Sequence, residues 1–416
     1  MPVSLESIND GSSYDVVIVG AGMVGASAAI GFADLGMSVL LVDAFSFPEP
    51  VDIYTPSYDE RSTALSSGTQ EVLCRLGVWN NISKHACPIS NIHVSEQGRF
   101  GTLKMSAEEF DQTALGYVVS NKWFGQCLLK RIAEQEIIFC APVKVSNIVL
   151  ENENQYITLG STGALTKKVL SKLVLIVDGS NSETAQLLGI EHSVEDYHQQ
   201  ALVANVSTEL PNNGVAYERF TSEGPLAVLP LTESTSSVVW THDEHRSRHF
   251  QGLDDAGFCR ELEQVFGERL GRIVACGKRQ SYSLKIIRAV EECRSGVLLL
   301  GNAAHSLHPV AGQGFNLAIR SVASLLEMVK ASVSSNGELN SDYSSLKSLN
   351  QLCQSRLDDK SKTIFMSDQL IKIFGHPSFL VGVARDIGLV GLDNSPIFKS
   401  MFASRAMGLS IKKARF

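Results

Sequence analysis

The stretch DVVIVGAGMVG, from Asp15 to Gly25, decides the fold of this chain. It begins with a short apolar run, which is typical of a parallel strand that is covered on both faces. Three glycines with the spacing GxGxxG follow, and the alanine-rich sequence from Ala26 to Leu35 predicts a helix that Gly36 ends. The segment from Ser38 to Val42 predicts a second strand, parallel to the first because crossovers of this kind are right-handed. The N-terminal segment therefore predicts one βαβ unit.

Each glycine of this fingerprint has a separate task in binding a dinucleotide. Gly20 permits the tight turn after the strand, Gly22 lets the backbone approach a pyrophosphate, and Gly25 lets the helix and the strand pack closely. Asp43 ends the second strand, where its carboxylate can accept hydrogen bonds from ribose hydroxyls. The fingerprint therefore predicts dinucleotide binding, with a purely structural glycine turn as the alternative. It does not distinguish NAD from FAD.

A second glycine-rich loop lies far along the chain. The apolar run from Gly296 to Leu300 predicts a buried strand, and it leads into a loop from Gly301 to Asn316 that contains three glycines and one proline. Such a backbone lets a flat or anionic ligand approach its amides. An ordinary connection between a strand and the helix predicted from Gly314 to Val329 is the alternative interpretation.

The sequence between the two loops predicts two kinds of structure. A helical period from Asn121 to Gln135 is followed by a short strand and then by an antiparallel meander that ends near Val177. From about Glu191 to Ile287, alternating polar and apolar residues predict a second, mostly antiparallel sheet with one face toward solvent or a ligand. After a polar segment from Ser332 to Ser345, the remainder predicts helices.

Composition limits the class of protein. Hydrophobic residues make up 44% and charged residues 19%, which indicates a globular chain. The net charge of −8 disfavours nucleic acid as a partner. The eight cysteines are scattered without a CxxC pair, so we expect no metal site. The polar N-terminus lacks the basic and apolar parts of a secretory signal, and we expect the chain to stay in the cytoplasm.

Together these motifs resemble the flavoprotein aromatic hydroxylases, and within them the monooxygenases of ubiquinone biosynthesis. The resemblance extends over nearly the whole chain and is most specific in HPVAGQGFNL, from His308 to Leu317. It also includes the segment from Asp59 to Leu65 and the pair Asp178-Gly179. The segment from Tyr217 to Ala227 is similar to the branch that hydroxylates a polyprenylated methoxyphenol.

The resemblance implies an α/β fold with a Rossmann-like FAD-binding domain, a second, mostly antiparallel β substrate domain and a C-terminal helical region. We expect the FAD domain at residues 1–85, 117–190 and 288–330, the substrate domain at 86–116 and 191–287, and the helical region at 331–416. The implied activity is ring hydroxylation of a polyprenylated methoxyphenol with FAD, NAD(P)H and O2. A flavin reductase acting on prenyl lipids, and a non-catalytic prenyl-lipid binding or assembly protein, are the rival hypotheses.

The resemblance also implies roles for single residues. The fingerprint would hold the FAD pyrophosphate, Asp43 the adenosine ribose, and the loop from Gly312 to Asn316 would lie along the flavin ring. Asn302 stands where relatives commonly carry Asp, and Ser321 follows Arg320 where relatives also carry Asp. The expected FAD contacts are Gly20, Gly22, Gly25, Asp43, Arg61, Gln126, Val145, Asp178, Asn302, Gly312, Gln313, Gly314, Phe315 and Asn316.

No residue can be assigned firmly to catalysis. The candidates are His308 and Pro309 in the second loop and Tyr217 and Arg219 on an alternating strand, where ordinary sheet residues are the alternative. The last twenty residues contain five cations and no acid. A basic tail resting on an anionic membrane surface and a C-terminal helix packed on the core are both open interpretations. A complex with other proteins of ubiquinone biosynthesis is a further expectation.

Overall fold

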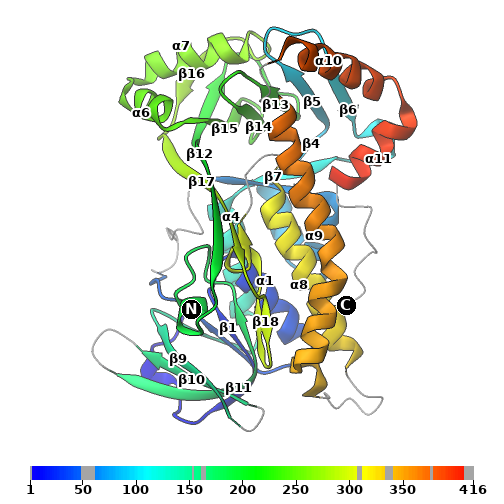
Figure 1. The fold of residues 1–416 in the computed structure, drawn as a ribbon. Coiled ribbons are helices and arrows are strands. Elements are labelled where there is room, and N and C mark those ends of the chain that lie inside the picture. The colour runs from blue at the N-terminus through cyan, green and yellow to red at the C-terminus, as the bar shows by residue number, and fades with distance from the viewer. Residues whose placement is uncertain are drawn as a thin grey trace.

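A computed structural model describes residues 2–47, 61–151, 154–160, 165–306, 312–332, 341–374 and 378–406. Figure 1 shows one sheet in the lower half of the molecule and a second sheet in the upper half. Two long helices, α8 (Gln313–Ala331) and α9 (Leu346–Phe374), run beside them. The α/β class with a second, mostly antiparallel sheet and C-terminal helices is thereby confirmed.

The lower sheet is built around the predicted βαβ unit. Strand β1 pairs in parallel with β2 on one side and with β11 on the other, and the order along the sheet is β18-β19-β11-β1-β2-β8. Strands β9, β10 and β11 form the predicted antiparallel meander. The strands are β1 (Ser13–Val19), β2 (Val39–Val42), β8 (Ile137–Cys140), β9 (Lys144–Glu151), β10 (Asn154–Gly160), β11 (Thr166–Ile176), β18 (Cys293–Arg294) and β19 (Val297–Leu299).

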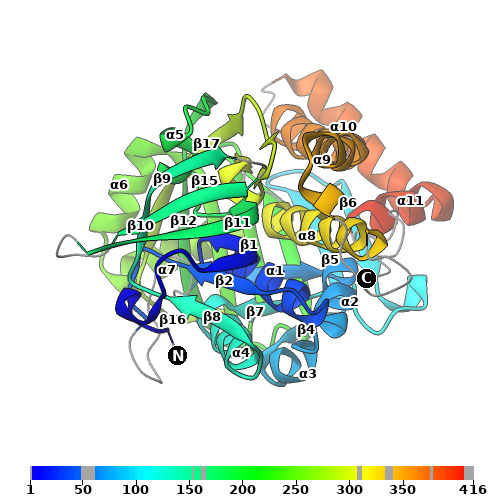
Figure 2. The ribbon, with the colours of Figure 1, turned by 90° about the horizontal axis from the view of Figure 1, so that it is seen from below.

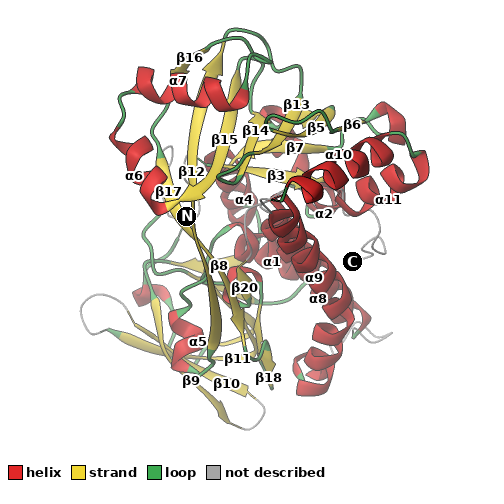
Figure 3. Ribbon diagram, turned by 45° about the horizontal axis from the view of Figure 1, so that its top comes forward, coloured by secondary structure: helices red, strands yellow, loops and turns green. Residues whose placement is uncertain are grey.

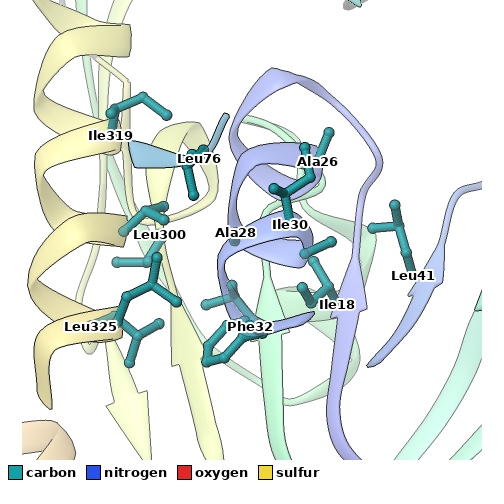
Figure 4. Packing of buried hydrophobic residues seen from close by; sticks show 14 of the residues in the cluster. Ile18, Ala26, Ala28, Ile30, Phe32, Leu41, Leu76, Leu300, Ile319 and Leu325 are labelled. Atoms are coloured by element: carbon teal, nitrogen blue, oxygen red, sulfur yellow. The ribbon is translucent and has the colours of Figure 1, made fainter. Parts of the chain in front are cut away.

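Helices α1 (Met23–Asp34) and α8 (Gln313–Ala331) cover one face of this sheet. Figure 4 shows Phe32 on the side of α1 that faces Leu325 and Leu300, and Ile18 and Ile30 together on the side toward Leu41. Full burial of each such side chain contributes roughly 1.5–3 kcal/mol to the free energy of unfolding. A side chain at Gly31 would lie 2.3 Å from Leu326, so the two helices approach as closely as they do because this position has none.

The upper sheet collects strands from two distant parts of the sequence. Its order is β20-β17-β12-β15-β14-β13-β5-β6, with β16 paired to β12, and of these neighbours only β13 and β5 run parallel among the described residues. Its strands are β5 (Asn91–Glu96), β6 (Thr102–Ser106), β12 (His192–Thr208), β13 (Val215–Phe220), β14 (Pro225–Pro230), β15 (Thr235–Asp243), β16 (Ile273–Cys276), β17 (Gln280–Ala289) and β20 (His305–Ser306).

Two helices within the predicted sheet region were not anticipated. Helices α6 (Glu244–Gly252) and α7 (Asp255–Phe266) pack on one face of the upper sheet through Phe250, Phe258 and Phe266. Each begins with an aspartate whose side chain accepts a hydrogen bond from a backbone N–H of the first turn. We call this side the α7 face of the upper sheet, and the opposite side the inner face.

A small third sheet, β3-β7-β4, and the remaining helices connect the two large sheets. Figure 3 shows helices α8 to α11 gathered on one side of the molecule, and Figure 2 shows α10 and α11 on its outside. Among the described residues, no helix is both long enough and apolar enough to cross a bilayer. These elements are β3 (Ser62–Ser66), β4 (Cys87–Ile89), β7 (Gly116–Ser120), α2 (Ser67–Arg75), α3 (Trp79–Ile82), α4 (Asn121–Ala133), α5 (Glu183–Leu187), α9 (Leu346–Phe374), α10 (Phe379–Asp393) and α11 (Pro396–Ala406).

Candidate functional site

The turn between β1 and α1 has a backbone that only glycine allows. Gly20 adopts a φ of 109°, and a Cβ atom there would lie 2.6 Å from the carbonyl oxygen of Val177. A Cβ atom at Gly25 would lie 1.9 Å from the carbonyl oxygen of Gly20. Gly22 is the N-cap of α1, and the first turn of this helix carries no acidic residue. The helix therefore presents amide groups and a positive dipole end, with no carboxylate within its own first turn.

Two aspartates flank this turn at the carboxyl ends of β2 and β11. Asp43 accepts hydrogen bonds from the backbone N–H of Ala21 at 2.7 Å and of Phe45 at 2.8 Å. Burial, with a smaller contribution from the negative charge of Asp178, raises the pKa of the Asp43 carboxyl. Asp178 accepts a hydrogen bond from the N–H of Thr184 at 3.2 Å, while its Oδ1 atom is buried and has no hydrogen-bond donor within the described part of the chain. These carboxylates are suited to accept hydrogen bonds from the hydroxyl groups of a ligand.

The second glycine-rich loop lies beside the first. Its start, the short 3-10 helix η4 (Gly301–Ala303), is placed between α1 and α8, because a Cβ atom at Gly301 would contact Val24 at 3.6 Å and Ala318 at 3.8 Å. Asn302 is exposed at this position. The two loops, far apart in the sequence, therefore meet at the same edge of the lower sheet. His308 and Pro309 lie outside the described residues.

The N-terminus of α8 is fixed by Asn316. Its side-chain oxygen accepts hydrogen bonds from the N–H of Ser66 at 2.9 Å and from the hydroxyl of Thr69 at 2.7 Å. Its amide nitrogen donates to the carbonyl oxygens of Ala64 and Gly312, both at 2.9 Å. These four bonds saturate the Asn316 side chain, which therefore positions the loop and has no polar atom left for a ligand. The neighbouring Gln313 is buried.

Three further expected contacts lie around this junction. Arg61, just before β3, stacks its guanidinium on the ring of Tyr282 in β17 with 4.7 Å to the ring centroid, so it joins the third sheet to the inner face of the upper sheet. Phe315 packs edge-on against Phe124 of α4, the helix that also carries the partly buried Gln126. Gly314, in the first turn of α8, is partly buried.

Val145 lies on β9, away from the N-terminus of α8. Its side chain is buried in the hydrophobic cluster on the opposite face of the lower sheet. A contact with adenine there would have to use its backbone, as the family resemblance implies.

Tyr217 and Arg219 lie on the α7 face of the upper sheet. The Tyr217 ring packs edge-on against His93 and against Phe266 of α7. Arg219 donates a hydrogen bond from Nε to the carbonyl oxygen of Val265 at 2.8 Å. Because residues that pair across neighbouring strands share a face, the pairing of Tyr217 with Val228 places both with the α7 cluster. Their contacts are those of ordinary sheet residues.

Glu218 is not among the site residues predicted from the sequence. The alternation of β13 places it on the inner face. Glu218 pairs with Ala227, and Ala227 pairs with Val239. Following the pairs onward across β12 to β17 puts Glu218 on the same face of the sheet as Tyr282. Glu218 makes no hydrogen bond or ion pair in the described structure, and burial raises the pKa of its carboxyl to about 7. The alternation along this strand predicts that Glu218 lies on the face opposite to Tyr217 and Arg219. It does not predict which of the two faces is the inner one.

The match to a family model decides the identity of the site. The model described as "FAD binding domain" matches residues 13–339, which include both glycine-rich loops. The chain belongs to the FAD binding domain family. The residues present fit FAD, because the glycine turn leads into the amide end of α1. The Oδ1 atom of Asp178, which has no hydrogen-bond partner among the described residues, lies next to this turn. The predicted cofactor and the predicted class of FAD-dependent aromatic-ring monooxygenase are thus confirmed.

Several known proteins resemble this chain over most of its length. Ubiquinone hydroxylase UbiL of Rhodospirillum rubrum is 31% identical over 395 residues, covering 95% of this chain and 89% of the relative. The 3-demethoxyubiquinol 3-hydroxylase of Escherichia coli is 29% identical over 409 residues, covering 95% and 98%. The solved structure of p-nitrophenol 4-monooxygenase PnpA from Pseudomonas putida superimposes with a TM-score of 0.77 over 95% of this chain and 99% of the other. At 17% identity this last likeness shows the fold alone.

Proposed function

We propose that this FAD-dependent monooxygenase hydroxylates the ring of a polyprenylated methoxyphenol in ubiquinone biosynthesis, with NAD(P)H and O2 as co-substrates. The observation that carries the proposal is the contrast between the two faces of the upper sheet. On the α7 face Leu202, Leu226 and Trp240 are completely buried. On the inner face, Val203 of β12, Val239 of β15 and Ala227 of β14 are only partly buried. An uncovered apolar surface next to Arg61 suits a flat, apolar ring.

The named relatives support the choice of substrate class. The Rhodospirillum rubrum and Escherichia coli proteins are both named for hydroxylation in the ubiquinone series, and both align along nearly the whole of this chain. The assignment to the branch that acts on the methoxyphenol rests on the resemblance of the segment from Tyr217 to Ala227. The proposal therefore places the prenyl phenol between the inner face and the flavin.

The protein's own residues would have three tasks in this reaction. The turn from Gly20 to Gly25 would bind the pyrophosphate, and Asp43 and Asp178 would accept hydrogen bonds from FAD hydroxyls. The backbone amides of residues 312–314 would lie along the flavin ring and favour negative charge there. When bound, FAD supplies the redox chemistry that activates oxygen. The inner face would orient the substrate ring and exclude water from it.

The polyprenyl tail of the proposed substrate bears on where the enzyme acts in the cell. Such a substrate partitions into a bilayer, so we place the enzyme in the cytoplasm, in peripheral contact with the inner membrane through its C-terminal region. Contact with other proteins of the same pathway is part of this proposal, since they would share the membrane-bound intermediates.

The test is a stoichiometric one. Purified enzyme should be yellow, and added polyprenyl methoxyphenol should stimulate NAD(P)H oxidation and O2 uptake with one hydroxylated product per O2, identified by mass spectrometry. NAD(P)H oxidation that reduces the prenyl chain, without O2 incorporation into the ring, would support the flavin reductase instead. Protein that is colourless and inactive would support a non-catalytic lipid-binding role. Analysis of the lipids that accumulate in a strain lacking the protein would identify the substrate independently.

A further inference from the structure

Three charged residues of helices α10 and α11 are buried. Arg385 is buried and its Nη2 atom lies 2.6 Å from Glu96 of β5. Asp386 is buried and accepts a hydrogen bond from the N–H of Gly101 at 3.1 Å. Lys399 is buried next to Asp393, with 3.2 Å between Nζ and the carboxylate oxygen. These ion pairs and hydrogen bonds hold the two helices in one orientation on the β5–β6 hairpin.

The outward side of the same helices is apolar. Ile397 is 74% exposed and Phe398 63%, and the other exposed large apolar side chains there are Ile387, Val390 and Met401. Between Ala384 and Met401 no side chain of the exposed class is charged. A helix on the surface of a soluble protein normally has the opposite arrangement, with its charges toward water. Figure 1 shows α10 and α11 at the outside of the molecule, where no described element covers them.

A basic pocket adjoins this apolar surface. The pocket has a volume of about 540 Å³, and Val383 and Asp386 of α10 form one of its walls. Arg219 and Arg269 line it, and within the described structure neither makes an ion pair with a carboxylate, since their hydrogen bonds go to Val265, Ser95 and Phe266. Burial and the neighbouring positive charge of Arg269 lower the pKa of Arg219. The carboxylates of the pocket, Glu96 and Asp386, pair with Arg99 and Arg385 instead. Among the described residues, Arg219 and Arg269 are therefore two neighbouring cations without an ion-pair partner.

The rim of the pocket continues the apolar surface. Phe100, at the turn between β5 and β6, lines the pocket and is 73% exposed. Val383, Ile387 and Val390 follow one another at helical spacings of four and three, so they form a stripe on α10 that leads from the pocket toward α11. We name the set Phe100, Ile387, Val390, Ile397, Phe398 and Met401 the apolar platform.

We propose that the apolar platform inserts into an anionic phospholipid bilayer while Arg219 and Arg269 bind the phosphate of a lipid headgroup. Apolar side chains that enter the acyl boundary beside cations at headgroup depth are the arrangement by which proteins bind the surface of a membrane. The platform gains by leaving water, and the two guanidinium groups gain a counter-charge that the protein does not supply.

Charge complementarity favours a membrane over a second protein surface. From Lys399 to the last residue the sequence contains five cations and no acid, although the whole chain has a net charge of −8. The two arginines that line the pocket beside the apolar platform, Arg219 and Arg269, match anionic headgroups in charge. The preference for a membrane also rests on the proposed function, because a polyprenyl substrate would reach the upper sheet from the bilayer.

The experiment is flotation of the FAD-loaded, full-length protein with vesicles, in the absence of substrate. We expect co-flotation with vesicles of phosphatidylcholine and phosphatidylglycerol at about three to one, and roughly tenfold weaker partitioning to phosphatidylcholine alone. The double variant Ile397→Ser with Phe398→Ser should weaken partitioning to the anionic vesicles by about tenfold or more. Arg269→Gln should weaken it by roughly fivefold and reduce its salt dependence.

A matched control uses apolar side chains that are equally exposed elsewhere. Val274, in the upper sheet, is 60% exposed, and Val290, near the lower sheet, is 72% exposed. The double variant Val274→Ser with Val290→Ser should bind the vesicles like the wild type. Thermal melting and flavin absorbance of each variant establish that it is folded and loaded. Unchanged flotation of the Ile397 and Phe398 double variant would overturn the proposal. So would flotation by none of the proteins, or a wild-type dimer in analytical ultracentrifugation that this variant converts to monomer. None of these outcomes bears on hydroxylation, which is measured separately with substrate and O2.

Discussion

The two large sheets place functional residues in different ways. In the lower sheet the proposed pyrophosphate site is a contiguous turn that would act through its backbone, so Gly20, Gly22 and Gly25 can be named from their spacing alone. In the upper sheet the side chains matter, and the neighbours Tyr217 and Glu218 point to opposite faces. A site formed by the backbone of one segment can therefore be predicted from the local sequence. A side-chain site depends on register and on which face another element covers, and both depend on distant segments.

The largest expected effect is at the backbone site. Gly25→Ala places a Cβ atom 1.9 Å from the carbonyl oxygen of Gly20, a clash between two backbone segments that no side-chain rotation relieves. We expect loss of bound FAD and a free energy of unfolding lowered by about 3 kcal/mol or more, which for a chain of this length lowers the melting temperature by roughly 3–4 °C or more. Gly252→Ala is the control, because a Cβ atom there meets nothing within 4 Å. Flavin absorbance and thermal melting of the purified variants measure both effects.

The second largest effect is expected at Asn316, which fixes the N-terminus of α8 between the two sheets. Asn316→Ala removes four hydrogen bonds and leaves the N–H of Ser66 without its acceptor. We expect the free energy of unfolding in urea to fall by about 2–4 kcal/mol, with weaker FAD retention. Asn302→Ala, at an exposed position of the neighbouring loop, should leave the unfolding free energy within about 0.5 kcal/mol of the wild type. Equal stability of the two variants would mean that Asn316 does not fix the start of α8.

Asn316 also shows what sequence could and could not predict. The βαβ unit with its glycine turn, the meander and the second sheet follow from local periodicity and turn residues, and the structure confirms them. The partner of Asn316 is Ser66, 250 residues away, and no local pattern predicts that pairing. Helices α6 and α7 were missed although Asp243 and Asp254 precede them as N-caps, because the surrounding alternation favoured strands.

A smaller effect, with a defined pH dependence, is expected on the inner face. Burial raises the pKa of Glu218 to about 7 in the folded protein, above its usual value in an unfolded chain. The folded state therefore holds its proton more tightly, and the stability that this provides at low pH is lost as pH rises through about 7. Glu218→Gln should remove this loss, making the variant about 2 kcal/mol more stable than wild type at pH 8 and similar to it at pH 4.

Urea unfolding of both proteins across this pH range measures the difference. Glu223→Gln is the comparison, since Glu223 already forms an ion pair with Arg246 at 3.0 Å. Its removal should destabilise the protein or leave it unchanged, with no gain above pH 7. A stability difference between wild type and Glu218→Gln that stays constant with pH would place the Glu218 carboxyl in water and remove it from the inner face.

The smallest expected effect is on the α7 face. Tyr217→Phe keeps the ring that packs on His93 and Phe266, and it removes a hydroxyl for which the described structure contains no hydrogen-bond partner. We expect unfolding free energy to change by less than about 0.5 kcal/mol and kcat/KM to stay within about twofold of the wild type. Steady-state O2 uptake with the phenol substrate measures the second quantity. A fall of a hundredfold in kcat/KM would require the Tyr217 hydroxyl to reach the substrate. The faces of the upper sheet would then be reversed, and Glu218 would lie against α7 instead.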